Sequence, residues 1–192
     1  MTVAQNGATS GFPDDRAVRP VRYTTATLGG LGLVERMLMA TDGTVTILLE
    51  QIVGETIMTS GLEHRMGEVD PDAAAALPYP VSSLLTRTTQ LVGVETGILY
   101  VRATSVFCPD ALPEPVRTGL LTADEPLGRL LRRNRVESFR EILSIDLPDE
   151  HGPAEPRRRY AIYIGGSPAV HIAETFTAHC FERRAAMAVG AE

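Results

Sequence analysis

The sequence RRRYAIYIGGSPAVHIAETF occupies residues 157–176. Its two runs, 159–164 and 169–176, are rich in β-branched and aromatic residues, and the pair Gly165-Gly166 lies between them. Paired glycines between two such runs are typical of a tight turn. The stretch therefore predicts an antiparallel hairpin, and with it an antiparallel sheet as the framework of the fold.

Other runs extend this sheet. Residues 83–92 and 98–107 flank the turn-sized segment GVETG, which predicts a second hairpin. A further strand is expected at 136–147. The runs 44–53 and 55–66, joined at Gly54, predict a third hairpin.

Helical signals are fewer. In residues 31–40, apolar side chains recur at helical spacing before the turn Asp42-Gly43. In residues 122–134, Thr122 and Glu125 have capping-box spacing, and three leucines share one helical face. Residues 70–80 and the proline-rich 109–115 are predicted as loops. About six strands with few helices between them predict an α+β fold with an antiparallel sheet, and not a parallel one.

Composition limits the function classes. The chain has 192 residues and a formal net charge of −6, which disfavours nucleic acid as a partner. The basic clusters 132–135 and 157–159 are short, and we interpret them as solvated faces. No signal peptide or apolar run of membrane-spanning length is present, so we expect a cytoplasmic protein with no membrane partner. Cys108 and Cys180 lack metal-ligand spacing and are expected to be reduced structural thiols.

The chain is expected to divide into two parts. Residues 1–22 are polar and contain Gly and Pro without an apolar period, which predicts a disordered N-terminal arm. Residues 23–192 have a length suited to a single domain.

Two charged residues fall on apolar strand faces. Because strand side chains alternate, Glu174 shares a face with Val170, Ile172 and Phe176, and Arg87 shares one with leucines. A buried charge is normally paired or used. One hypothesis is a structural Arg87–Glu174 salt bridge. The other is a closed pocket in which Arg87 binds a substrate carboxylate and Glu174 transfers a proton.

Four segments together resemble one known family. They are VERMLMATDGTVTILLEQIVGE, LTRTTQLVGVETGILYVRATSV, DEPLGRLLRRNRVESF and RRRYAIYIGGSPAVHIAETF. In order and spacing they are similar to the chorismate lyase family (chorismate pyruvate-lyase, 4-hydroxybenzoate synthase), in particular to its actinobacterial branch. The likeness covers residues 31–181.

The resemblance implies a six-stranded antiparallel sheet with helices on one face, a monomer, a ligand buried beneath two helical flaps, and no metal or other cofactor. It implies that Arg87 holds the ring carboxylate and that Glu174 faces the ring hydroxyl. Leu127 of the P-L-G turn and Val34, which replaces a Met, would cap the carboxylate through backbone amides. Ala173, where the family has Thr, and Val34 are departures expected to alter the pocket wall.

The sequence gives weaker reasons to assign a function to Arg102 and the histidines. Arg102 either holds a second carboxylate or forms a structural ion pair. No zinc spacing surrounds His64, His151, His171 or His179, and we assign none of them a role.

Three functions follow as hypotheses. The first is a lyase that converts chorismate into an aromatic carboxylate, 4-hydroxybenzoate, and pyruvate, with Arg87 and Glu174 as its catalytic residues. The second is a non-catalytic ligand-sensing domain, since a similar fold serves bacterial transcription regulators. The third is a secondary-metabolism relative that acts on a related cyclic carboxylic acid, in which the departures at Val34 and Ala173 would alter the product.

Overall fold

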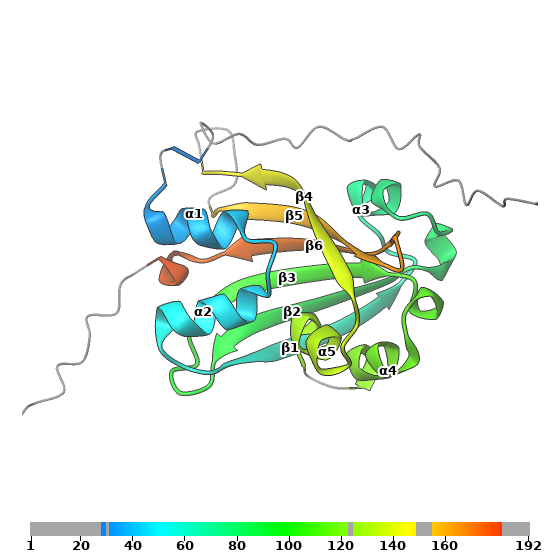
Figure 1. The fold of residues 1–192 in the computed structure, drawn as a ribbon, viewed down its shortest axis with the longest axis horizontal. Coiled ribbons are helices and arrows are strands. Elements are labelled where there is room, and N and C mark those ends of the chain that lie inside the picture. Colours follow the sequence, from blue (N-terminus) through cyan, green and yellow to red (C-terminus); the bar gives the residue numbers. More distant parts are fainter. Residues whose placement is uncertain (1–27, 30, 123–124, 149–154, 182–192) are drawn as a thin grey trace, which may run out of the picture.

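A computed structural model describes residues 28–29, 31–122, 125–148 and 155–181, so the predicted arm at 1–22 lies outside the described residues. Within them one six-stranded sheet has the order β1-β2-β3-β6-β5-β4, and every neighbouring pair is antiparallel (Figure 1). The strands are β1 Ile57–Met66, β2 Leu85–Gly93, β3 Leu99–Phe107, β4 Ser138–Asp146, β5 Arg157–Ile164 and β6 Ser167–Phe176.

Five helices in the described ranges accompany the sheet: α1 Leu33–Ala40, α2 Val45–Val53, α3 Pro71–Ala76, α4 Glu114–Thr122 and α5 Leu127–Arg133. Short 3-10 turns lie at Val81–Ser83, Pro109–Ala111 and Ala178–Cys180. The predicted α+β class with an antiparallel sheet is confirmed.

Two predicted hairpins are confirmed. Strands β2 and β3 pair across the GVETG turn, and β5 and β6 pair across Gly165-Gly166. Both glycines have positive φ values, 58° and 79°, which side chains with a Cβ rarely adopt. The hairpin therefore needs glycine at its turn. The strand expected at 136–147 is β4, at the sheet edge.

The hairpin predicted for residues 44–66 is wrong, because its first half is helix α2. The buried residues are Val45, Thr46, Leu49 and Val53; because Thr46 is buried next to Val45 and three residues before Leu49, they follow a helical and not a strand period. Gly54, with φ 75°, ends the helix in the left-handed conformation typical of a C-cap. The β-branched content of this segment suggested a strand, but packing against the sheet favours the helix.

Other predicted boundaries also differ from the structure. Asp70 caps helix α3 by accepting from the backbone N–H of Asp72 and Ala73, in a segment predicted as loop. Helix α4 begins within the proline-rich stretch. Thr122 ends α4 and donates to the carbonyl of Thr118 at 2.7 Å, so the capping box predicted with Glu125 does not form.

The main core lies between one face of the sheet and the helices α1, α2, α4 and α5. A smaller cluster around Ala73, Leu77 and Val106 packs α3 against the other face. Cys108 and Cys180 are free and buried, as expected for structural thiols. Both predicted site charges lie on the face that α1, α2, α4 and α5 cover, which is called the helix-covered face below.

Candidate active site

A recess lies on the helix-covered face of the sheet. The empty space in this recess is ≈ 500 Å³, which includes space open to solvent. The sheet contributes one wall, and the segments that begin α2 and α5 contribute another. The lining residues are Gly43, Thr44, Val45, Thr46, Thr59, Arg87, Thr89, Leu91, Ala103, Ser105, Pro126, Leu127, Gly128, Arg140, Tyr160, Ile162, Ile172 and Glu174.

Arg87 lies on β2 and is buried, as the alternation predicted. Its Nη2 donates to the carbonyl of Glu125 at 3.1 Å, directly before the segment that starts α5. The strand therefore holds the guanidinium in the recess, and the guanidinium in turn fixes the approach to α5.

Glu174 lies on β6 and is also buried. One carboxylate oxygen accepts from Arg158 Nε at 2.7 Å and the other from the Tyr160 hydroxyl at 3.0 Å. The partner of Glu174 is thus Arg158, and the structural Arg87–Glu174 salt bridge is not the arrangement found. Both predicted charges instead line one recess, separated by strand β3.

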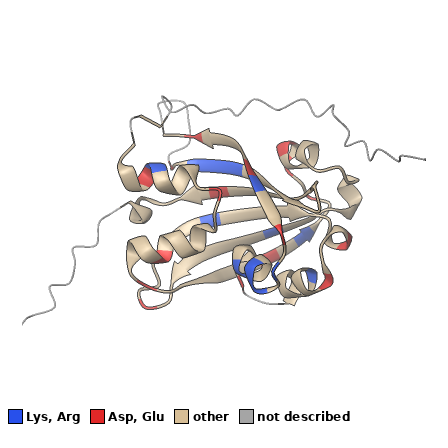
Figure 2. Cartoon of the chain, in the orientation of Figure 1, with Lys and Arg blue, Asp and Glu red and all other residues tan. Residues whose placement is uncertain are grey.

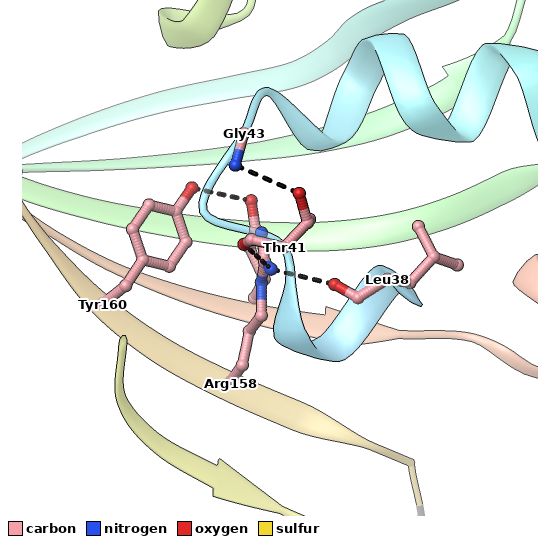
Figure 3. A network of polar contacts seen from close by, with 6 residues as sticks. Leu38, Thr41, Gly43, Arg158 and Tyr160 are labelled. Atoms are coloured by element: carbon pink, nitrogen blue, oxygen red, sulfur yellow. Dashed lines mark hydrogen bonds and ion pairs between the residues drawn. The ribbon is translucent and has the colours of Figure 1, made fainter. Parts of the chain in front are cut away.

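Arg158 connects the carboxylate to the end of α1. Its Nη1 donates to the carbonyls of Leu38 at 2.8 Å and Thr41 at 2.9 Å (Figure 3). The guanidinium also lies 4.9 Å from the ring centroid of Tyr160 and 5.6 Å from that of Phe176. Charge-assisted hydrogen bonds and two aromatic faces thus hold one buried cation.

Burial is the largest single influence on Arg158 and lowers the pKa of its guanidinium, but the charges and hydrogen bonds of Glu174 and Tyr160 together outweigh burial, so that this pKa is raised. Burial also raises the pKa of Tyr160, so its hydroxyl remains a proton donor to Glu174. The result is a carboxyl group whose two oxygens are both held by hydrogen bonds at the recess.

Sequence reasoning missed Arg158. The run 157–159 was interpreted as solvated, and it forms a blue band on β5 in Figure 2. In fact Arg158 is only 1% exposed, whereas Arg157 is exposed. Strand alternation could have identified Arg158, since it shares its parity with Tyr160 and Ile162.

Leu127 lines the recess with its neighbours Pro126 and Gly128 at the start of α5. A Cβ added at Gly128 would lie 2.5 Å from the Cγ2 of Thr44, so the starts of α5 and α2 are in close contact. The first backbone N–H groups of a helix lack intrahelical acceptors and carry partial positive charge. The starts of α2 and α5 line the same recess as Arg87, and together they favour the binding of an anion there.

The two departures from the family pattern lie elsewhere. Val34 is partly buried and packs against the core, and it is not among the lining residues. Ala173 alternates with Glu174 along β6 and does not line the recess either. The segment that lines it near α1 is Gly43–Thr46, which sequence reasoning did not select.

Thr59 and Arg140 are further lining residues that sequence reasoning did not select. Thr59 is 1% exposed, and its Oγ1 has no hydrogen-bond partner among the described residues. Arg140 Nη1 lies 3.4 Å from the carbonyl of Asp42. Arg102, in contrast, forms an ion pair with Glu155 at 2.7 Å and does not line the recess, which confirms the structural alternative for this residue.

The described histidines lie outside the recess. His64 Nε2 is 3.2 Å from the carbonyl of Leu120, and His171 is buried on the opposite face of β6. Among the described residues, no group of three or more His, Cys, Asp or Glu side chains has the arrangement of a metal site. None of the helices in these ranges has the length and apolar character required to cross a membrane.

Comparison with known proteins identifies the class. No family model matches the chain. The chain is 30% identical over 158 residues to a chorismate pyruvate-lyase of Mycobacterium leprae. The aligned residues cover 77% of this chain and 75% of the relative. The chain is also 28% identical over 160 residues to the chorismate pyruvate-lyase of Mycobacterium tuberculosis, covering 76% of this chain and 80% of the relative.

These relatives assign the chain to the lyases. It belongs to the chorismate pyruvate-lyase family, with relatives in the actinobacterial branch that the resemblance predicted.

Solved structures with a partial likeness of fold include PhnF from Mycobacterium smegmatis, with a TM-score of 0.49, 14% identity and coverage of 73% of this chain and 66% of that one. The C-terminal domain of the histidine utilization repressor from Pseudomonas syringae has a TM-score of 0.41, 13% identity and coverage of 71% and 99%. This likeness adds nothing to the assignment of function.

Proposed function

We propose that this lyase converts chorismate into 4-hydroxybenzoate and pyruvate, with Arg87 and Glu174 as its catalytic residues. The observation that carries the proposal is that these two buried side chains line the same recess from different strands. The mycobacterial relatives are named for this activity.

Arg87 binds the ring carboxylate. A guanidinium offers two parallel N–H donors that match a carboxylate, and burial strengthens such a contact. The start of α5 at Leu127 and the start of α2 at Val45 add backbone dipoles at the same recess. The ring is thereby oriented with its opposite end toward Glu174.

Glu174 handles the proton. Its two oxygens accept hydrogen bonds from Arg158 and Tyr160, so it is placed to take up a proton rather than to donate one. In the reaction the ether C–O bond at ring carbon 3 breaks and the hydrogen at carbon 4 leaves as a proton. The ring becomes aromatic, and the proton returns to the methylene carbon of the enolpyruvate, which gives pyruvate.

The test is to incubate the purified protein with chorismate and to separate the products by chromatography. We expect 4-hydroxybenzoate and pyruvate in equal amounts. Consumption of chorismate to a different aromatic acid would assign the enzyme to another reaction of the family. Tight binding of 4-hydroxybenzoate without any turnover would contradict the lyase activity on chorismate and favour a sensing role.

A further inference from the structure

The recess contains a second cation, opposite Arg87. Arg140 lies on β4, partly buried, and lines the recess. Its Nη1 donates to the backbone carbonyl of Asp42 at a long 3.4 Å. This contact holds the side chain toward the turn between α1 and α2 but does not neutralise its charge.

The acidic side chains of β4 and β6 are engaged elsewhere. Glu174 pairs with Arg158, and Asp146 pairs with Arg159 at 2.7 Å. Glu141, next to Arg140 in sequence, accepts from the Tyr163 hydroxyl at 2.6 Å. Within the ranges that the structure describes, no carboxylate forms an ion pair with Arg140, whose charge therefore faces the recess uncompensated.

The two arginines approach the recess from opposite sides. In the order β1-β2-β3-β6-β5-β4, Arg87 lies on the second strand and Arg140 on the last, and Glu174 lies on β6 between them. A molecule that contacts both guanidinium groups passes over the carboxylate of Glu174. This arrangement suits a ligand with two anionic groups and a reactive centre between them.

We propose that Arg140 binds the second carboxylate of the substrate, the one on the enolpyruvyl ether. The inference rests on the proposed function, because chorismate has one carboxylate on the ring and another on the ether side chain. The product 4-hydroxybenzoate retains only the ring carboxylate. Arg140 therefore distinguishes the dianionic substrate from the monoanionic product, and it keeps its contact with the pyruvate that leaves.

The experiment compares two stable aromatic probes that do not react. One is 4-hydroxybenzoate, and the other is 3-(carboxymethoxy)-4-hydroxybenzoate, which adds an ether-linked carboxylate at the ring position of the enolpyruvyl group. The dissociation constants of both are measured by calorimetry for the wild type and for Arg140→Gln, Arg140→Lys and Arg87→Ala. Arg102→Gln is the matched control, because it removes an arginine outside the recess.

We expect Arg140→Gln to raise the dissociation constant of the dicarboxylate about tenfold, which corresponds to one charge-assisted contact at a partly exposed site. The dissociation constant of the monocarboxylate should change by less than about twofold. Arg140→Lys should restore part of the loss, since it keeps the charge but not the fork. Arg87→Ala should weaken both probes, and Arg102→Gln neither.

The assignment would be overturned if the wild type bound the two probes with equal affinity. It would also be overturned if Arg140→Gln lost affinity for both probes by the same factor. The outcome is separable from that of the proposed function. A wild type that binds the dicarboxylate through Arg140 but does not cleave chorismate keeps the two-carboxylate site and refutes only the reaction.

Discussion

Among single residues, Thr59 differs from its neighbours because its buried hydroxyl oxygen has no hydrogen-bond partner among the described residues. A buried polar atom without a partner costs about 1–3 kcal/mol, and it usually has a ligand-related or structural cause. Since Thr59 lines the recess, a bound ligand is the natural partner of this hydroxyl.

Thr59→Val should therefore separate binding from stability. Valine has nearly the same shape and lacks the unsatisfied hydroxyl, so the free energy of unfolding should stay the same or rise by about 1 kcal/mol. The dissociation constant for 4-hydroxybenzoate should rise by up to about tenfold. Urea unfolding and calorimetry measure both quantities, with the exposed Thr88→Val as control. A loss of stability with unchanged affinity would show that the hydroxyl has an internal role.

Glu174→Gln tests proton transfer. Glutamine keeps the shape of glutamate but does not exchange a proton, so kcat for chorismate should fall by roughly 10²–10⁴. Binding of 4-hydroxybenzoate should persist, because Arg87 lies two strands away from Glu174. Steady-state kinetics and calorimetry give the two values. Near-normal turnover in this variant would refute the acid–base role and favour a concerted rearrangement.

Some of the single residues of the candidate site could be predicted from the sequence, and others could not. Alternation along β2 and β6 predicted that Arg87 and Glu174 each lie on the apolar face of their strand, and the structure confirms that both are buried. Alternation along β5 held the same information about Arg158, but its place in a run of three arginines suggested a solvated face. Thr59 and Arg140 had no such signal, because a recess is formed by distant segments that pattern alone does not bring together.

Among the elements, helix α2 shows where pattern reasoning fails. Residues 45–53 combine β-branched residues with leucines in a short apolar run, which fits a strand or a buried helix equally well. The hairpins around Gly165-Gly166 and GVETG were predictable because the turn residues are local signals. The role of α2 depends on its contact with the sheet and with α5, and no local signal encodes that contact.

Arg158 is the connection between the elements α1, β5 and β6. Replacing it with methionine keeps an unbranched apolar stem, leaves Glu174 buried without its cation, and removes the donor to Leu38 and Thr41. Breaking one side of a buried ion pair typically costs about 3–5 kcal/mol, so the free energy of unfolding should fall by about that amount.

The same Arg158→Met variant should also exchange backbone amide hydrogens faster in the α1–α2 turn, because that turn loses its anchor to β5. Hydrogen exchange followed by mass spectrometry measures this, and Arg158→Lys should lie between the wild type and methionine. Unchanged protection of the turn would mean that Arg158 serves Glu174 alone.

For the whole molecule, the buried His171 makes stability depend on pH. Burial lowers its pKa below the ordinary value of 6.5, although Asp70 and Asp72 oppose this shift and Arg159 adds to it. The unfolded chain then binds a proton at a higher pH than the folded one. The contribution of His171 is fully present above pH 6.5 and is lost as the pH falls from there toward the folded-state pKa.

The free energy of unfolding should thus fall more between pH 7 and pH 5.5 in the wild type than in His171→Leu, which has no group to titrate at this position. Urea unfolding at both pH values measures the difference, in which the contributions of the remaining carboxylates cancel. Parallel losses in the two proteins would show that His171 is not the source.

The contact between Gly128 and Thr44 has a consequence for the evolution of the family. A side chain at position 128 would meet the Cγ2 methyl of Thr44 at 2.5 Å, so position 128 accepts a larger residue only if the side chain at position 44 turns away or becomes smaller. Among homologous sequences, a larger residue in place of Gly128 should therefore occur together with a smaller residue at position 44, for instance glycine. The glycine of the P-L-G turn is thus one member of a pair whose other member lies 84 positions earlier in the sequence.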